Sequence, residues 1–212
     1  YSEKYDTKVA NGRVFKQTDR EHNLVYLMKS NLLKRLESSV HSFSLTLQNI
    51  IQQIEEHIKK IDCYDESSGT IGEMDGIDAE DPELEEALIG SKVKIFLKDM
   101  DLIRWKQDLL YDREILLRLL HEARNVTPDR DQKLLALKRL IEQKIKHLIN
   151  DQNKKLLIFT AFADTAKYLY ENLHQWVRSQ FGLHCAVVTG TNQPKTTLKM
   201  KKIDFNHVLI NC

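Results

Sequence analysis

The chain has 212 residues, of which 42 % are hydrophobic and 30 % charged, as expected for a helix-rich globular protein of one large or two small domains. No apolar run approaches the ~20 residues that span a bilayer, and no signal peptide opens the sequence. Its three cysteines are an odd number at no metal-like spacing, which favours a reducing, cytoplasmic location.

The charge is unevenly distributed. Eleven acidic residues and no Lys or Arg lie between Ile61 and Ser91. Since the whole chain has 32 basic and 31 acidic residues, the remainder carries 32 basic against 20 acidic, a net charge of +12. A basic body of this kind suits a polyanionic partner such as nucleic acid. We expect no membrane partner. The alternative is an ordinary lysine-rich, solvated helix surface.

The first predicted helix runs unbroken from about Thr18 to Ile61. Its apolar residues alternate spacings of three and four, which is typical of a heptad seam. We call these residues the predicted seam: Leu33, Leu36, Val40, Phe43, Leu47, Ile50 and Ile54. A continuous helix of this length would extend about 60 Å.

Residues 62–90 interrupt the helical pattern. They hold four of the seven glycines together with Pro82, so we predict a solvated acidic loop. A second helix is predicted from Ser91 to Ala123. The two helices would form an antiparallel hairpin with the acidic loop at its tip, which makes residues 1–127 the first predicted domain.

A third helix is predicted after this hairpin, with Thr127 as N-cap and Pro128 at the first helical position. Its expected apolar face is formed by Leu134, Leu137, Ile141, Ile145 and Leu148. It begins the second predicted domain, residues 128–212.

From Lys155 the pattern alternates between strand and helix. Strands are predicted at 156–162, 183–190 and 206–212, with a helix over 163–182 closed by Gly182 and a short helix from Pro194. Such alternation is typical of a parallel sheet with right-handed crossovers. The predicted fold class is therefore mostly α, a long antiparallel helical hairpin followed by a partial α/β domain with three parallel strands.

Several kinds of active site have no sequence support. The chain has no phosphate loop, dinucleotide fingerprint or nucleophile elbow. The acidic run at 77–83 follows no apolar strand that could position a carboxylate on Mg²⁺, and the spacing of Asp75, Asp78 and Asp81 misses the calcium-loop pattern. We assign no catalytic and no metal-binding residue.

Two turns follow predicted strands and could contact phosphate, since ligands gather where strands end and helix N-termini begin. The first is Thr160–Asp164, and the second is Thr189–Asn192, with Lys195 one helical step beyond. The alternative reading is plain capping, by Asp164 for one helix and by Thr191 or Asn192 for the next.

A family resemblance enters at residues 131–173. The helix motif D-x-K-x-x-x-L at Asp131–Leu137 and the strand motif at Lys155–Phe162 resemble the entry into the second RecA-like lobe of Swi/Snf-like ATP-dependent DNA translocases, which belong to helicase superfamily two. Residues 27–43 resemble the helical insert of bacterial helicase-like proteins of this type.

The resemblance implies a fragment that holds the helical insert and the first half of the second motor lobe. The first lobe with its phosphate loop and the later arginine-bearing motif are missing, so ATP and Mg²⁺ would bind only in the full-length parent, and this chain alone would not hydrolyse ATP. By position, Thr160, Ala161, Phe162, Thr189 and Gly190 would face nucleic-acid backbone, with double-stranded DNA as the expected partner. The hairpin would clamp the duplex or dock a protein.

The competing hypothesis is a non-enzymatic coiled-coil hairpin that binds a protein partner and carries a small α/β cap. The predicted seam supports it. It would self-associate through the hairpin.

Overall fold

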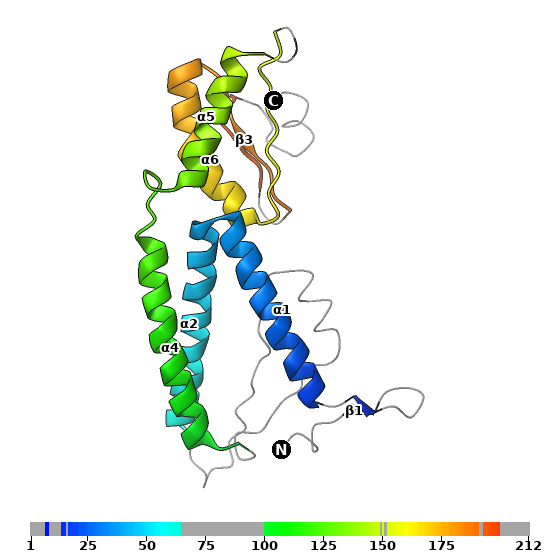
Figure 1. Ribbon diagram of the computed structural model, residues 1–212, viewed down its shortest axis with the longest axis vertical. Helices are drawn as coiled ribbons and strands as arrows, with labels where there is room; N and C mark the ends of the chain where they lie inside the picture. Colours follow the sequence, from blue (N-terminus) through cyan, green and yellow to red (C-terminus); the bar gives the residue numbers. More distant parts are fainter. Residues whose placement is uncertain are drawn as a thin grey trace. The chain divides into compact units, whose positions relative to one another are not determined.

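The fold is known from a computed structural model, which describes residues 7–8, 14–15, 17–64, 100–148, 150, 152–190 and 193–199. Most of them lie in helices, so the mostly-α prediction is confirmed (Figure 1). The helices are α1 (Gln17–Ser38), α2 (Val40–Asp62), α4 (Leu102–Arg124), α5 (Gln132–Lys146) and α6 (Ala163–Phe181). The predicted acidic loop beyond Tyr64, residues 91–99 and the predicted strand at 206–212 lie outside the described residues.

The chain divides into two compact units. Unit 1 contains Tyr1–Leu33 and Leu47–Leu119, and unit 2 contains Lys34–Thr46 and Leu120–Cys212. The boundary between α1 and α2, which we call the α1–α2 junction (Lys34–Thr46), therefore belongs to the same unit as α5 and α6.

The unbroken first helix is a wrong prediction, because the helix ends at Ser38 and a new one begins at Val40. Ser39 serves both ends: its amide donates to Arg35 O at 2.9 Å, and its carbonyl accepts from Phe43 N at 3.0 Å. Its hydroxyl also accepts from Ser42 N at 3.5 Å. Serine favours such caps because its short side chain competes with the helix for backbone groups.

In unit 1, α2 and α4 lie side by side and run antiparallel, as predicted (Figure 1). Lys106 pairs with Asp62, and Arg113 Nε lies 2.8 Å from Glu55 Oε1. The two ion pairs are seven residues apart on each helix, in opposite chain directions, as antiparallel packing requires. Asp101 begins α4 by accepting the Arg104 amide at 3.0 Å. The unit also holds a short hairpin, β1 (Thr7–Lys8) paired antiparallel with β2 (Val14–Phe15).

The predicted seam is buried only in α2. Leu47 is 1 % exposed, whereas Leu33 in α1 is 66 % exposed. The buried apolar residues of α2 are Leu47, Ile51, Ile54 and Ile61, so Ile51 takes the place that the prediction gave to Ile50. The heptad spacing therefore holds within α2 and stops at the break.

Unit 2 has its core between α5 and α6, and strand β3 (Ala186–Val187) contacts α6. Leu134 and Ile141 from α5 are buried against three residues of α6, which are Tyr168, Leu173 and Val177. Leu137 and Ile145 pack against this cluster, so the predicted apolar face of α5 is confirmed except for Leu148, which follows the end of the helix. Helix α6 ends where predicted, at Gly182 with a left-handed φ of 66°, and its amide bonds Arg178 O at 3.1 Å.

Helix α5 begins four residues later than predicted. Its N-cap is Asp131, not Thr127, because the Asp131 carboxylate accepts the amides of Lys133 and Leu134 at 2.9 and 3.1 Å. Residues Pro128–Arg130 form a turn instead, closed by the Asp131 amide on Thr127 O at 2.9 Å.

The three-stranded parallel sheet is also a wrong prediction. The described part of unit 2 holds one two-stranded antiparallel sheet, in which Ala186 pairs with Thr196 and Val187 with Lys195. Lys195 therefore lies in strand β4 (Lys195–Thr196), where the sequence predicted a helix. The β-branched Thr197 extends this pairing, because its amide and hydroxyl both bond Cys185.

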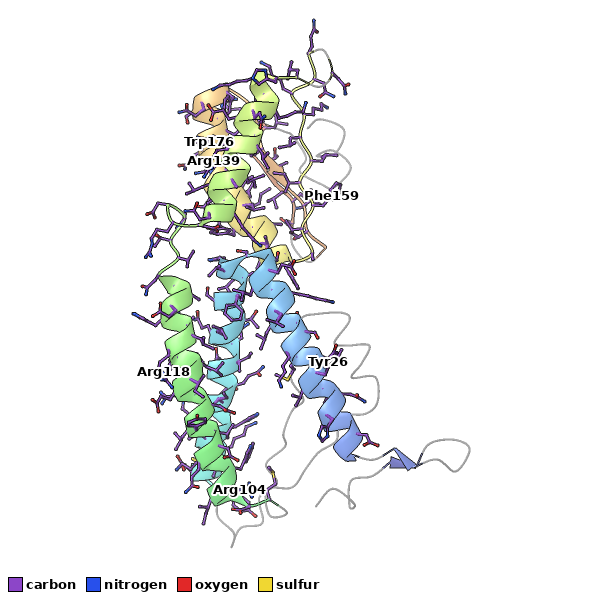
Figure 2. All side chains as sticks on the ribbon, in the orientation of Figure 1. Tyr26, Arg104, Arg118, Arg139, Phe159 and Trp176 are labelled. Carbon is purple, nitrogen blue, oxygen red and sulfur yellow. The ribbon has the colours of Figure 1, made fainter. Side chains whose placement is uncertain are left out.

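The predicted strand at 156–162 has no regular secondary structure, and it has no ladder partner among the described residues. Phe159 is 90 % exposed and projects from this segment (Figure 2). The start of the segment is fixed to α5 by Lys144 Nζ, which donates to Asn153 O at 2.9 Å. A run that is apolar on both faces indicates a buried strand only where neighbouring elements cover both of those faces.

Candidate nucleic-acid interface

The turn Thr160–Phe162 leads from the apolar residues 156–159 into α6. Phe162 is the N-cap residue, with extended backbone at φ −117° and ψ 133°, and no side chain caps the helix. Its carbonyl accepts the Ala166 amide at 3.2 Å and the Thr160 hydroxyl at 2.9 Å. The Thr160 hydroxyl proton is thus already used in a hydrogen bond within the turn. A phosphate here would accept hydrogen bonds from backbone amides and not from the Thr160 hydroxyl.

Asp164 does not cap α6, contrary to the capping alternative. It lies inside the first turn, one residue after Ala163. Its carboxylate pairs with Arg35 at 3.3 Å and more weakly with Lys167 at 3.9 Å. An acidic residue in a first turn complements the positive end of the helix dipole.

Arg35 was not predicted as a functional residue, yet its guanidinium contacts this turn at Phe162. It belongs to the last turn of α1 and is 9 % exposed. Its guanidinium lies over the Phe162 ring, 4.7 Å from the centroid, while Nη1 donates to Asp164. Such stacking plus pairing suits the planar guanidinium.

Further contacts fix the α1–α2 junction to α5 and α6 within unit 2. The Ser38 and Thr165 hydroxyls are 2.9 Å apart, and Lys133 Nζ donates to the Glu37 carbonyl. The His41 ring stacks on Tyr168 with 4.7 Å between centroids. Ser42, in the same junction, is fully buried.

Asp131 joins the start of α5 to the N-terminal half of α6. Besides capping α5, it accepts the Tyr168 hydroxyl at 2.9 Å. Burial, this hydrogen bond and the carboxylate charge together raise the pKa of Tyr168. The Asp131 and Lys133 of the D-x-K motif thus both have structural contacts, one to α6 and the other to the α1–α2 junction.

The second predicted turn follows β3. Thr189 is half-buried and Gly190 is exposed, with open space where a Cβ would stand. Lys195 is exposed on β4 opposite Val187. Thr191 and Asn192, the other capping candidates, lie outside the described residues. The six predicted contact residues thus lie in two stretches of the chain, Thr160–Phe162 before α6 and Thr189, Gly190 and Lys195 at β3 and β4.

The charge around α5 is positive. Residues 129–155 contain eight Lys and Arg against four Asp and Glu, a net charge of +4. Arg139 is exposed on α5 (Figure 2). Lys138 instead lies over the Trp176 ring at 5.6 Å. Among the described residues, no three potential metal ligands cluster.

Comparison with protein-family models, with curated proteins and with solved structures finds no match to this chain. None of the described helices is both long and apolar enough to cross a membrane.

Proposed function

We propose that this chain is part of an ATP-dependent nucleic-acid helicase or translocase, to which it contributes the helical insert and part of the second motor lobe. The observation that carries the proposal is the turn Thr160–Phe162, which leads into a helix without a side-chain cap. Uncapped amides at a helix N-terminus are donors for a phosphate group. The sequence resemblance assigns nucleic-acid backbone contact to the same three residues.

The charge supports the same proposal. The net +4 of residues 129–155 lies in the stretch that leads to this turn, and contacts to phosphate need no sequence information. Support does not come from the sheet, since the described strands pair antiparallel. In this proposal ATP and Mg²⁺ bind to other parts of the parent protein, between its two lobes.

The first test measures binding of this chain to a fluorescently labelled duplex by anisotropy, over a series of salt concentrations. We expect affinity to fall steeply with salt and to be the same for unrelated sequences. Ala161→Glu puts a negative charge on the exposed turn and should weaken binding about tenfold, whereas Gln180→Glu adds the same charge near the other end of α6 and should change little. A flat salt dependence, or equal effects of both variants, would contradict the proposal.

The second test concerns ATP. We expect no ATPase activity from this chain alone and nucleic-acid-stimulated ATPase activity from the longer parent. A parent without a phosphate loop in a preceding lobe would remove the helicase assignment.

One observation favours the coiled-coil hairpin as a second candidate function. Helix α4 exposes Ile103, Leu110 and Leu117 at intervals of seven residues, which is the spacing of a coiled-coil contact. This function predicts dimers in sedimentation equilibrium that Leu110→Glu dissociates. A chain that sediments as a monomer at every concentration would speak against it.

A further inference from the structure

We infer that Arg35 is a positioning residue of the Thr160–Phe162 turn. It neutralises the charge of Asp164 and holds the Phe162 ring in place. Phosphate can therefore approach the turn only while the α1–α2 junction is packed beside it. This inference rests on the proposed function and deepens it by naming how the same site is regulated. Arg35, Phe162 and Asp164 all lie in unit 2.

The charge on Asp164 is the first reason. Its carboxylate stands in the first turn of α6, next to the amides that a phosphate would use. An uncompensated carboxylate would repel that phosphate. Arg35 lies 3.3 Å from it, and both side chains are largely buried, at 10 % and 24 % exposure. Salt screens such a pair less than a surface pair. Lys167 is more exposed and farther away, so it compensates less.

The geometry at Phe162 is the second reason. The guanidinium covers the ring at 4.7 Å while it pairs with Asp164. Lysine could supply the charge but not the planar stacking surface. Arginine is therefore the side chain that performs both tasks, which fixes the orientation of Phe162 at the entry to α6.

The position of Arg35 in the chain is the third reason. It lies 129 residues before Asp164 and comes from the helical region, not from the strand-turn-helix that it supports. Ser38 and Glu37 beside it contact Thr165 and Lys133. A movement of the α1–α2 junction would therefore withdraw the positive charge, expose Asp164 and weaken the turn for phosphate. This couples the helical insert to nucleic-acid binding.

The test uses the full chain, the labelled duplex and the anisotropy assay, with circular dichroism to verify folding. Arg35→Ala should weaken binding about tenfold, because Asp164 loses its partner. Asp164→Asn in the same chain should restore affinity to within about threefold, because it removes the repulsion. Arg35→Lys should lie between Arg35→Ala and the unmodified protein.

Arg139→Ala is the matched control, since it removes the same charge from an exposed site on α5. It should reduce the slope of log affinity against log salt concentration by the equivalent of about one phosphate contact at most. Adding Asp164→Asn should not restore the affinity that Arg139→Ala loses. If Arg35 itself contacts phosphate, Arg35→Ala will behave like Arg139→Ala, and the inference is overturned.

Asp164→Asn alone keeps the test decisive if Arg35→Ala does not fold. We expect this variant to bind at least as tightly as the unmodified protein. Weaker binding by folded Asp164→Asn would overturn the inference. If the unmodified chain binds no duplex at low salt, the proposed function fails and the inference with it, whereas intact binding that ignores Arg35→Ala overturns the inference alone.

Discussion

Asp131 serves two helices of unit 2 through one carboxylate. One oxygen accepts the amides of Lys133 and Leu134, and the other accepts the Tyr168 hydroxyl. Asp131 and Tyr168 are both buried, so neither polar group can turn to solvent if the other is removed. No local pattern could predict this pair, because 37 residues separate its members.

Tyr168→Phe removes the hydroxyl and keeps the ring. We expect the free energy of unfolding of unit 2 to fall by about 1.5–3 kcal/mol, as for a lost hydrogen bond to a charged group. Urea unfolding followed by Trp176 fluorescence measures it. Tyr111→Phe, at an exposed site on α4, should change stability by less than about 0.5 kcal/mol. A Tyr168→Phe protein as stable as the unmodified one would show that the hydrogen bond contributes nothing.

At the scale of helices and strands, the sequence predicted correctly those features that depend on residues close together in the chain. The apolar face of α5 depends on helical period, and its prediction is confirmed except for Leu148, which lies beyond the helix end. The end of α6 at Gly182 depends on a left-handed glycine, and this prediction is confirmed. The break at Ser39 was missed, because the seam spacing is the same in one long helix as in two successive ones. Strand pairing was wrong for a related reason: the partner of β3 depends on contacts that no single segment encodes.

The candidate site divides in the same way. Thr160–Phe162 could be found from a strand-to-helix transition in the sequence. Arg35 could not, because an arginine between two residues of the predicted seam gives no sign of a partner 129 residues away. The mistaken role of Asp164 as a cap has the same cause, since its true partner comes from another helix.

The pairing of α2 with α4 should depend on pH through His57, whose ring lies 5.8 Å from that of Trp105. Burial, and then Lys60, lower the pKa of His57 below 6.5, while Glu56 opposes them. The unfolded chain then binds more protons than the folded one near this pKa. The stability contribution is therefore present above about pH 6.5 and is lost as pH falls.

His57→Phe should flatten this dependence between about pH 7 and pH 5. Urea unfolding followed by Trp105 fluorescence, in a Trp176→Phe background, provides the measurement. If both proteins lose stability equally over this range, another group causes the loss.

At the scale of the whole molecule, each compact unit has its own core and its own tryptophan. Leu47 in unit 1 and Leu134 in unit 2 are both 1 % exposed. Trp105 lies in α4 and Trp176 in α6, so each can report the unfolding of one unit. The two cores therefore allow a matched comparison.

Leu47→Ala and Leu134→Ala should each cost about 2–5 kcal/mol of unfolding free energy. We expect Leu47→Ala to shift the Trp105 transition and Leu134→Ala the Trp176 transition, each with little effect on the other. Single-tryptophan versions in urea separate the signals. Transitions that move together in both variants would show that the chain unfolds as one cooperative unit.

The origin of Arg35 within α1 also has a consequence during synthesis. Its partner Asp164 follows 129 residues later, so a ribosome adding ~5–20 residues per second needs roughly 6–26 s to deliver it. During that interval Ser38 and His41 of the α1–α2 junction also lack their α6 partners, Thr165 and Tyr168. Unit 2 can therefore complete its fold only after residues 47–119, which belong to unit 1, have been synthesised.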